Sequence, residues 1–120
     1  MASSVKGIDQ FLPLTLPVFY MLLSLSEGER HGYALKREIL QRTDKRINLG
    51  SGALYGAINK MLEQALIVES EERPDPHLDD ERRRYYKITA LGRRVVRAEI
   101  ARLRALLQLA ELRLGIPDTV

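Results

Sequence analysis

The stretch "LIVESEERPDPHLDDERRRYYKIT", residues 66–89, contains two short alternating segments on either side of a charged loop. Alternation over this length is typical of β-strands, and a polar loop with prolines between two such segments is typical of a hairpin. We therefore predict strands at residues 66–72 and 82–89. A metal site at the carboxylates and histidine of residues 75–81 is the alternative. The loop lacks the glycine kink of a calcium site, however, and Pro74 and Pro76 stiffen it.

Helical periodicity surrounds this hairpin. Apolar residues recur at helical spacing in segments 15–26, 31–43, 51–65 and 90–113. Thr15, Ser51 and Thr89 are expected to cap three of these helices, and Pro17 suits a first helical turn. The third helix has an apolar stripe that consists of Leu54, Ile58, Met61 and Leu62.

The order helix, helix, helix, hairpin, long helix is that of a winged helix-turn-helix. We expect a mainly α fold, with three helices and a two-stranded β-wing, followed by a long C-terminal dimerisation helix. The chain then divides into a flexible N-terminal arm (1–10), a winged DNA-binding domain (11–89), a dimerisation helix (90–114) and a tail (115–120).

Composition narrows the function. The chain has 120 residues, 45% of them hydrophobic, and a net charge of +3, which suits one modest core. Between Arg82 and Arg113 the sequence has ten Lys and Arg residues but two acidic residues, and this excess of positive charge favours an anionic partner. No cysteine is present, so disulfides and thiolate sites are excluded, as expected in a reducing cytoplasm.

The apolar segment 11–26 is broken by two prolines and is predicted to be a buried helix rather than a signal peptide or a membrane span.

Three motifs give the chain a resemblance to a known family. They are "LLSLSEGERHGYAL" (22–35), "GSGALYGAINKMLEQALI" (50–67) and "RRRYYKITALGRR" (82–94). In this order and at this separation they resemble the PadR-like transcriptional regulators, of the short branch with a single C-terminal helix. The resemblance implies a homodimeric bacterial repressor whose winged domain binds operator DNA and whose last helix dimerises.

The chain also departs from that family. Asn59 and Lys60 stand where the family often has two arginines, and Ala65 stands where it often has glycine. The base preference of relatives therefore does not transfer to this protein.

Candidate DNA contacts gather on the helix at 51–65. Ser51, Gly52 and Ala53 form its N-terminus, where free N–H groups attract a phosphate or approach base edges. Asn59 suits adenine, and Lys60 suits a phosphate or guanine. The resemblance favours a phosphate contact by the Tyr55 hydroxyl, with plain packing as the alternative. For the others, ordinary capping or an exposed helix face is the alternative.

The neighbouring helix and the wing supply further candidates. Lys36 and Arg37 are expected near phosphates, with a solvated face as the alternative. Tyr33 is a further candidate for DNA binding and is expected to take part in the packing between the helices at 31–43 and 51–65. His31 suits a capping role better than a metal ligand. Residues alternate along a strand, so the wing arginines point to two faces and only some contact DNA; these arginines are Arg82, Arg83 and Arg84.

A heptad seam runs along the last helix. Its members are Val96, Ile100, Leu103, Leu107, Ala110 and Leu114. The seam either covers the first helix of its own chain or meets a second copy. A helix of about 36 Å overhangs a domain this small, which favours the second copy.

Neither a glycine-rich phosphate loop nor a nucleophile with its base is recognisable, so we expect no enzyme, no metal and no cofactor. The leading hypothesis is a sequence-specific DNA-binding regulator, a homodimeric repressor on a palindromic operator, with no membrane role. One alternative is a regulator with a small-molecule effector pocket at the dimer helices, although the last helix has no aromatic residue to stack on a flat ligand. Another is a protein-interaction module with a degenerate DNA face.

Overall fold

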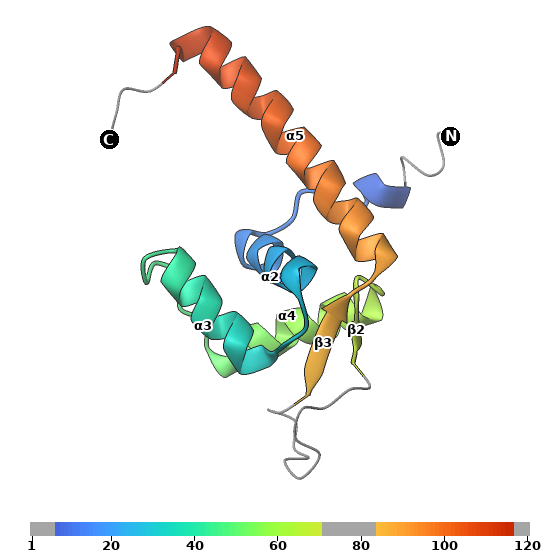
Figure 1. Cartoon of the computed structure of the whole chain (residues 1–120). Coiled ribbons are helices and arrows are strands. Elements are labelled where there is room, and N and C mark those ends of the chain that lie inside the picture. Colours follow the sequence, from blue (N-terminus) through green and yellow to red (C-terminus); the bar gives the residue numbers. More distant parts are fainter. Residues whose placement is uncertain (1–6, 71–83, 117–120) are drawn as a thin grey trace.

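The computed structural model describes residues 7–70 and 84–116. Figure 1 shows that helices predominate, with a small sheet at one side. In chain order the elements are α2 (Leu16–Glu27), β1 (Arg30–His31), α3 (Gly32–Arg42), α4 (Ser51–Glu63), β2 (Ile67–Glu69), β3 (Tyr85–Ile88) and α5 (Ala90–Leu114). The predicted winged helix-turn-helix with a long C-terminal helix is confirmed.

Helix α2 begins and ends for local reasons. The Thr15 hydroxyl accepts the N–H of Val18, and Pro17 stands in the first turn, where no N–H is needed. Gly28 ends the helix with a φ of 158°. This capping agrees with the sequence-based expectation.

The segment before α2 is more ordered than the predicted loose arm. Residues 7–9 form a helical turn, and the N–H of Phe11 donates to the carbonyl of Ile8. Ile8 and Phe11 pack, partly buried, against the hydrophobic core. These contacts are non-local, so no periodic pattern in residues 1–10 announces them.

The sheet has three strands in the order β1-β3-β2, and both pairings are antiparallel. The hairpin strands are confirmed at Ile67–Glu69 and Tyr85–Ile88, with Val68 opposite Lys87. The additional strand, Arg30–His31, pairs with Tyr86 and Tyr85. Two residues are too few for an alternating pattern, so the sequence predicted only the two-stranded wing.

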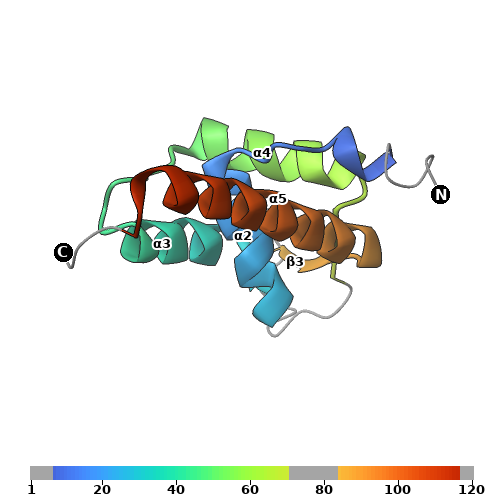
Figure 2. The same cartoon turned by 90° about the horizontal axis from the view of Figure 1, so that it is seen from above.

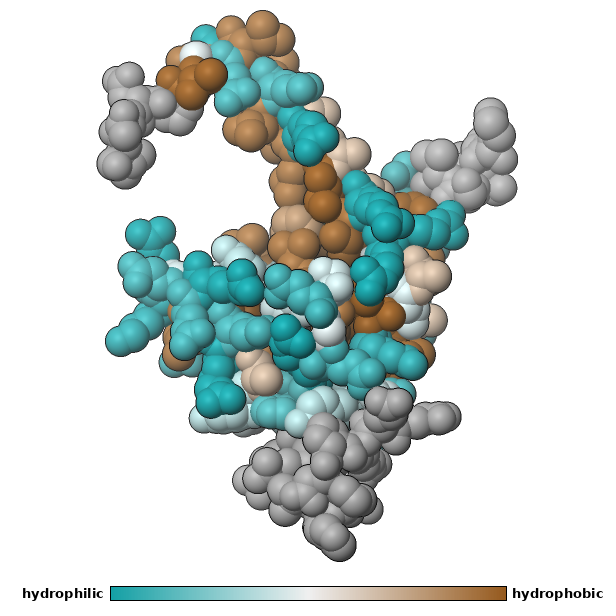
Figure 3. All heavy atoms as spheres, viewed as in Figure 1, coloured by the Kyte–Doolittle hydropathy of each residue, from teal (hydrophilic) through white to brown (hydrophobic). Residues whose placement is uncertain are grey.

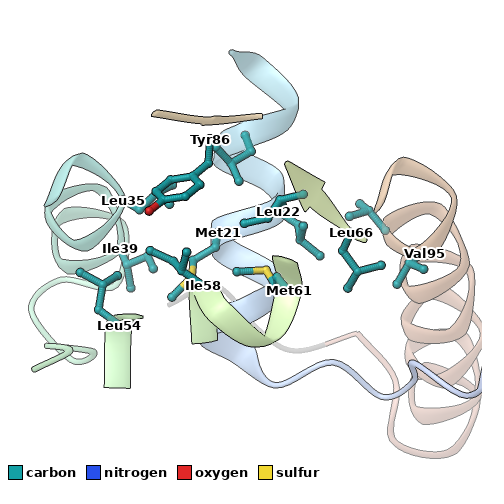
Figure 4. Close-up of a cluster of buried hydrophobic side chains, with 13 residues drawn as sticks. Met21, Leu22, Leu35, Ile39, Leu54, Ile58, Met61, Leu66, Tyr86 and Val95 are labelled. Carbon is teal, nitrogen blue, oxygen red and sulfur yellow. The ribbon is translucent and has the colours of Figure 1, made fainter. Parts of the chain in front are cut away.

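One core joins all the helices and the sheet (Figure 4). Its buried side chains include Met21, Leu22, Leu25, Leu35, Ile39, Leu54, Ile58, Met61, Leu66, Ile67, Tyr86, Val95 and Val96. The predicted stripe of α4 is buried except for Leu62, which is half-buried. The core continues past residue 89 into the first turns of α5.

Helix α5 then leaves the domain. Thr89 caps it by accepting the N–H of Gly92, as predicted. Its 25 residues span about 38 Å at 1.5 Å per residue. Figures 1 and 2 show that the helix crosses over α2 and that its C-terminal half stands clear of the domain.

Candidate nucleic-acid interface

The N-terminus of α4 is open. Gly50 is the N-cap residue, and no side chain caps the helix. The expectation that Ser51 is the cap is therefore wrong, because the helix begins one residue earlier and Ser51 is its first residue. Ser51, Gly52 and Ala53 are all exposed, as expected for residues that meet a ligand. The first N–H groups of α4 thus face outward without a side-chain acceptor, and they carry the positive end of the helix dipole.

Three glycines lie at or near the N-terminus of α4, and packing inside the protein does not require them. A Cβ placed on Gly50, Gly52 or Gly56 would meet no atom within 4 Å. Glycine lowers helix stability, so its use where packing allows a side chain suggests that space is needed outside the molecule. Gly56 was not among the sequence-based candidates; its one-turn spacing from Gly52 was the available signal.

The outward face of α4 lies opposite its buried stripe. Asn59 is exposed on that face, near its middle. Lys60 is also exposed but lies to one flank, towards residues 11–18. Glu63 is exposed one turn after Asn59 and adds a negative charge at the C-terminal end of the face. The N-terminal half of α4 is therefore the part best suited to an anionic partner.

Tyr55 packs against the start of α3. A Cβ on Gly32 would lie 3.0 Å from Cε1 and 3.1 Å from the hydroxyl oxygen of Tyr55. The ring is half-buried, and its position explains why glycine follows histidine in the "HGY" motif. Packing is thus one role of Tyr55. Lys36 is one turn after Gly32 on the same side of α3, and it is half-buried there.

The start of α3 combines a cap and an exposed aromatic residue. The Nδ1 of His31 accepts the N–H of Ala34 at 3.1 Å, so the predicted capping role is confirmed. Tyr33 is 54% exposed, and the guanidinium of Arg37 lies 5.3 Å from its ring centroid. The expectation that Tyr33 packs between two helices is wrong, because the buried side of α3 is formed by Gly32, Leu35 and Ile39.

The base of the wing carries a paired arginine. Nε of Arg84 lies 3.7 Å from Oε1 of Glu69. Both side chains are exposed enough for this ion pair to contribute less than about 1 kcal/mol. Tyr86 is buried and Lys87 is exposed, which is the expected alternation of β3. Arg82, Arg83 and the carboxylates at 75–81 lie outside the described residues.

The projecting part of α5 carries many exposed apolar side chains, and Figure 3 shows them among polar ones along the helix. Val96, expected to start the seam, is only 6% exposed, because it belongs to the core of its own domain. The open seam therefore begins at Ile100. Leu103 is half-buried, Leu107 is 58% exposed, Ala110 is exposed and Leu114 is 90% exposed. Further leucines widen the surface, namely Leu106, Leu109 and Leu112.

A buried carboxylate links α5 to the segment before α2. Glu99 is 1% exposed, and its Oε2 accepts the N–H of Leu14 at 2.8 Å. Both carboxylate oxygens also accept N–H groups of the Arg102 guanidinium. The hydrogen bond from Arg102 has the largest effect on the pKa of Glu99, and the bond from Leu14 acts in the same direction. Together they hold this pKa below its ordinary value, although burial opposes the shift. The sequence did not single out Glu99, which looked like one of two acids in a basic helix.

Two hollows lie beside these elements. A groove of about 360 Å³ runs between α2 and the loop after α3, and Leu16, Tyr20 and Arg46 line it. A smaller cavity of about 110 Å³ lies between residues 11–18 and α4.

Metal-binding clusters and membrane-spanning helices are both absent from the part of the chain that is described. Within residues 7–70 and 84–116, no three His, Asp or Glu side chains gather closely enough to hold a metal ion. Over the same residues, no helix has both the length and the hydropathy needed to cross a bilayer.

Comparisons with known proteins agree with this geometry. The model of the transcriptional regulator PadR-like family matches residues 21–98. A transcriptional regulator from Clostridium thermocellum is similar in structure, with a TM-score of 0.66 and 19% identity over 91% of this chain and 98% of that chain. A PadR family transcription regulator from Clostridium difficile R20291 has a TM-score of 0.66 and 20% identity, over 84% and 100% of the two chains. RosR from H. salinarum has a TM-score of 0.62 and 22% identity, over 88% and 99%. No curated protein matches the chain.

Proposed function

This chain belongs to the PadR-like family of transcriptional regulators, and on that premise we propose that it is a homodimeric repressor of a palindromic operator. Its general role is to regulate transcription by binding DNA. In the proposal, α4 enters the major groove, and the wing and α3 hold phosphates on either side. The observation that carries the proposal is the open, glycine-rich N-terminus of α4.

Helix α4 provides both positioning and base recognition. The uncapped N–H groups at Ser51, Gly52 and Ala53 receive a phosphate, since they hold partial positive charge and no side chain competes for them. Gly52 and Gly56 let the helix approach the groove closely. Asn59 then reaches a base edge, where an amide pairs best with adenine.

Flanking groups supply the charge. Tyr55 packs beside Gly32, and Lys36 lies one turn after Gly32 on α3, so in the proposal both contact the same stretch of DNA backbone. Arg37 and Tyr33 form an exposed pair on α3, whose guanidinium keeps free donors for the backbone. Lys60 holds a phosphate at the other flank. At the wing, one or two of Arg82, Arg83 and Arg84 contact phosphates. Where Arg84 does so, it gives up its ion pair with Glu69.

Dimerisation follows from the apolar end of α5. A stripe from Ile100 to Leu114 in water is stabilised by a second copy, and an isologous pair places two α4 helices on the halves of a palindrome. The groove between α2 and the loop after α3 has a mixed lining, in which Leu16, Tyr20 and Ile47 are the apolar residues that the end of the partner's helix can cover.

DNA binding is tested with the DNA upstream of the protein's own gene. Fluorescence anisotropy across a salt titration, with random DNA as competitor, should show specific binding that weakens steeply with salt. Gly52→Leu should lose at least about tenfold in affinity, because the new side chain blocks the approach to α4 without meeting any internal atom. Gly7→Leu is the matched control, since Gly7 also has open space but does not belong to α4. Equal affinity for upstream and random DNA would contradict the proposed specific binding to an operator.

The dimer is tested by light scattering after size exclusion. Leu107→Glu should weaken association at least about 100-fold, because each copy would bury an unpaired carboxylate in the seam. Gln108→Glu adds the same charge one position away, on the polar side of α5, and should leave the dimer intact. A dimer that tolerates both changes equally would show that the seam is not the interface.

A further inference from the structure

The cavity between residues 11–18 and α4 has a defined chemistry. Its volume is about 110 Å³, and it is open on one side. The lining residues are Phe11, Pro13, Leu14, Thr15, Val18, Ala57, Lys60, Met61, Gln64 and Leu66. Met61 and Leu66 are fully buried and form the apolar floor, so the interior favours a hydrocarbon group.

Polar groups stand at its mouth. Lys60 is exposed and is the only charged residue of the lining, and Gln64 is half-buried one turn later. Among the residues that the structure describes, no carboxylate belongs to the cavity wall. An ammonium at the rim of an apolar cavity without an acid selects a small molecule with an apolar body and one negative charge.

The position of the cavity connects two functional elements. One wall is α4, and the other is the segment around Leu14. The N–H of Leu14 is held by Glu99 of α5 at 2.8 Å, and Glu99 is held in turn by Arg102. An occupant of the cavity therefore lies between the helix that faces DNA and the segment that is tied to the projecting helix.

We propose that this cavity is an effector site for a short aliphatic carboxylate, with the hydrocarbon tail over Met61 and Leu66 and the carboxylate on the Lys60 ammonium. Occupancy lowers DNA affinity, because it neutralises Lys60 and wedges α4 away from residues 11–15. The inference rests on the proposed DNA-binding function for its biological role, but ligand binding itself does not depend on that function.

The first experiment uses the full-length protein without DNA. Pentanoate is titrated while amide shifts are followed by NMR, with 1-pentanol and pentylamine as neutral and cationic comparators. We expect saturable shifts at Leu14, Ala57, Lys60 and Gln64, with a dissociation constant of about 1 mM. Pentanol should bind more weakly and pentylamine should not bind. Absence of saturable shifts at these residues, or equal binding of pentylamine, would overturn the proposal.

Two variants separate charge from space. Lys60→Gln should weaken pentanoate about fivefold and leave pentanol unchanged, as for the loss of one exposed ion pair. Lys45→Gln is the matched control, since Lys45 is exposed but does not line the cavity. Ala57→Leu fills the cavity and should abolish binding of both ligands. Should Ala57→Leu fail to fold, the Lys60→Gln comparison alone decides, and an unchanged pentanoate affinity there counts against the proposal.

The second experiment measures DNA affinity with and without pentanoate, against an equal concentration of sodium chloride. Saturating pentanoate should lower the affinity of the wild type at least about threefold and leave Ala57→Leu unaffected. A protein that binds pentanoate in the cavity but no DNA would contradict the proposed function and not the ligand site. A protein that binds DNA specifically, but whose DNA affinity ignores pentanoate, would overturn the effector role alone.

Discussion

Gly92→Ala should destabilise the protein, although alanine is the better helix former. Gly92 lies in the first turn of α5, where exchange for alanine would by itself gain up to about 1 kcal/mol. A Cβ at this position, however, would overlap the carbonyl oxygen of Leu66 and lie 2.7 Å from Cγ1 of Ile88. Helix α5 can approach the sheet this closely only because residue 92 has no side chain.

The neighbouring atoms cannot move aside easily. The Leu66 carbonyl accepts the N–H of Thr89 at 3.0 Å, and the Thr89 hydroxyl is shared between the carbonyls of Ala65, at 2.7 Å, and Leu66, at 3.0 Å. Overpacking of a tight contact costs about 1–3 kcal/mol, and each strained hydrogen bond adds about 1 kcal/mol. After the gain in helix propensity is subtracted, we expect a net loss of about 2–4 kcal/mol in the free energy of unfolding.

Urea denaturation followed by circular dichroism measures this loss. Protein concentration is kept constant, because the stability of the proposed dimer would depend on it. Gly56→Ala is the matched control, since it is also a helical glycine but has no atom within 4 Å of its Cβ position. Gly56→Ala should raise the stability by up to about 1 kcal/mol. Should Gly92→Ala be as stable as the wild type or more so, the close contact between α5 and the start of β2 would be refuted.

Three further outcomes are expected. Glu99→Gln should lose about 1–3 kcal/mol near neutral pH. The pKa of Glu99 is below its ordinary value of 4.5 in the folded chain, chiefly because Arg102 donates to it, so the wild type loses this advantage as the pH falls below 4.5. Urea unfolding across that range should show the two proteins converging. His31→Ala should lose about 1 kcal/mol through its cap to Ala34, and His31→Asn should recover most of it in the same assay. Gly56→Ala should bind operator DNA less tightly in anisotropy titrations despite its greater stability.

Each of these has a contrary result that is easy to recognise. A constant difference between Glu99→Gln and the wild type down to acid pH would show that the charge of the carboxylate contributes nothing. Equal losses for the alanine and asparagine variants of His31 would assign the effect to its contact with the Tyr85 ring, at 5.3 Å, rather than to the cap. Unchanged DNA affinity in Gly56→Ala would place that face of α4 away from the duplex.

Local chemistry determined much of this protein in advance. Thr15 and Thr89 cap helices because a hydroxyl reaches an N–H three residues later, and that relation needs no other part of the chain. The stripe at Leu54, Ile58 and Met61 predicts a buried face because helical spacing alone aligns these side chains. The order of elements, read from such local patterns, was sufficient for the winged fold, and three sequence motifs carried the resemblance to the family.

Tertiary structure decided what depends on distant neighbours. Strand β1 exists because Tyr85 and Tyr86 offer it a free edge, and two residues carry no pattern of their own. The residue type of Tyr33 does not show whether its ring is buried, and only the packing of α3 in the folded chain leaves it exposed. Glu99 looked like a surface acid, yet the approach of Leu14 from 85 positions away in sequence made it a buried link. Helical periodicity shows which residues share a face of a helix. The contacts that cover such a face come from other segments of the chain. Only the folded chain therefore reveals which part of α5 belongs to the core and which part stays exposed.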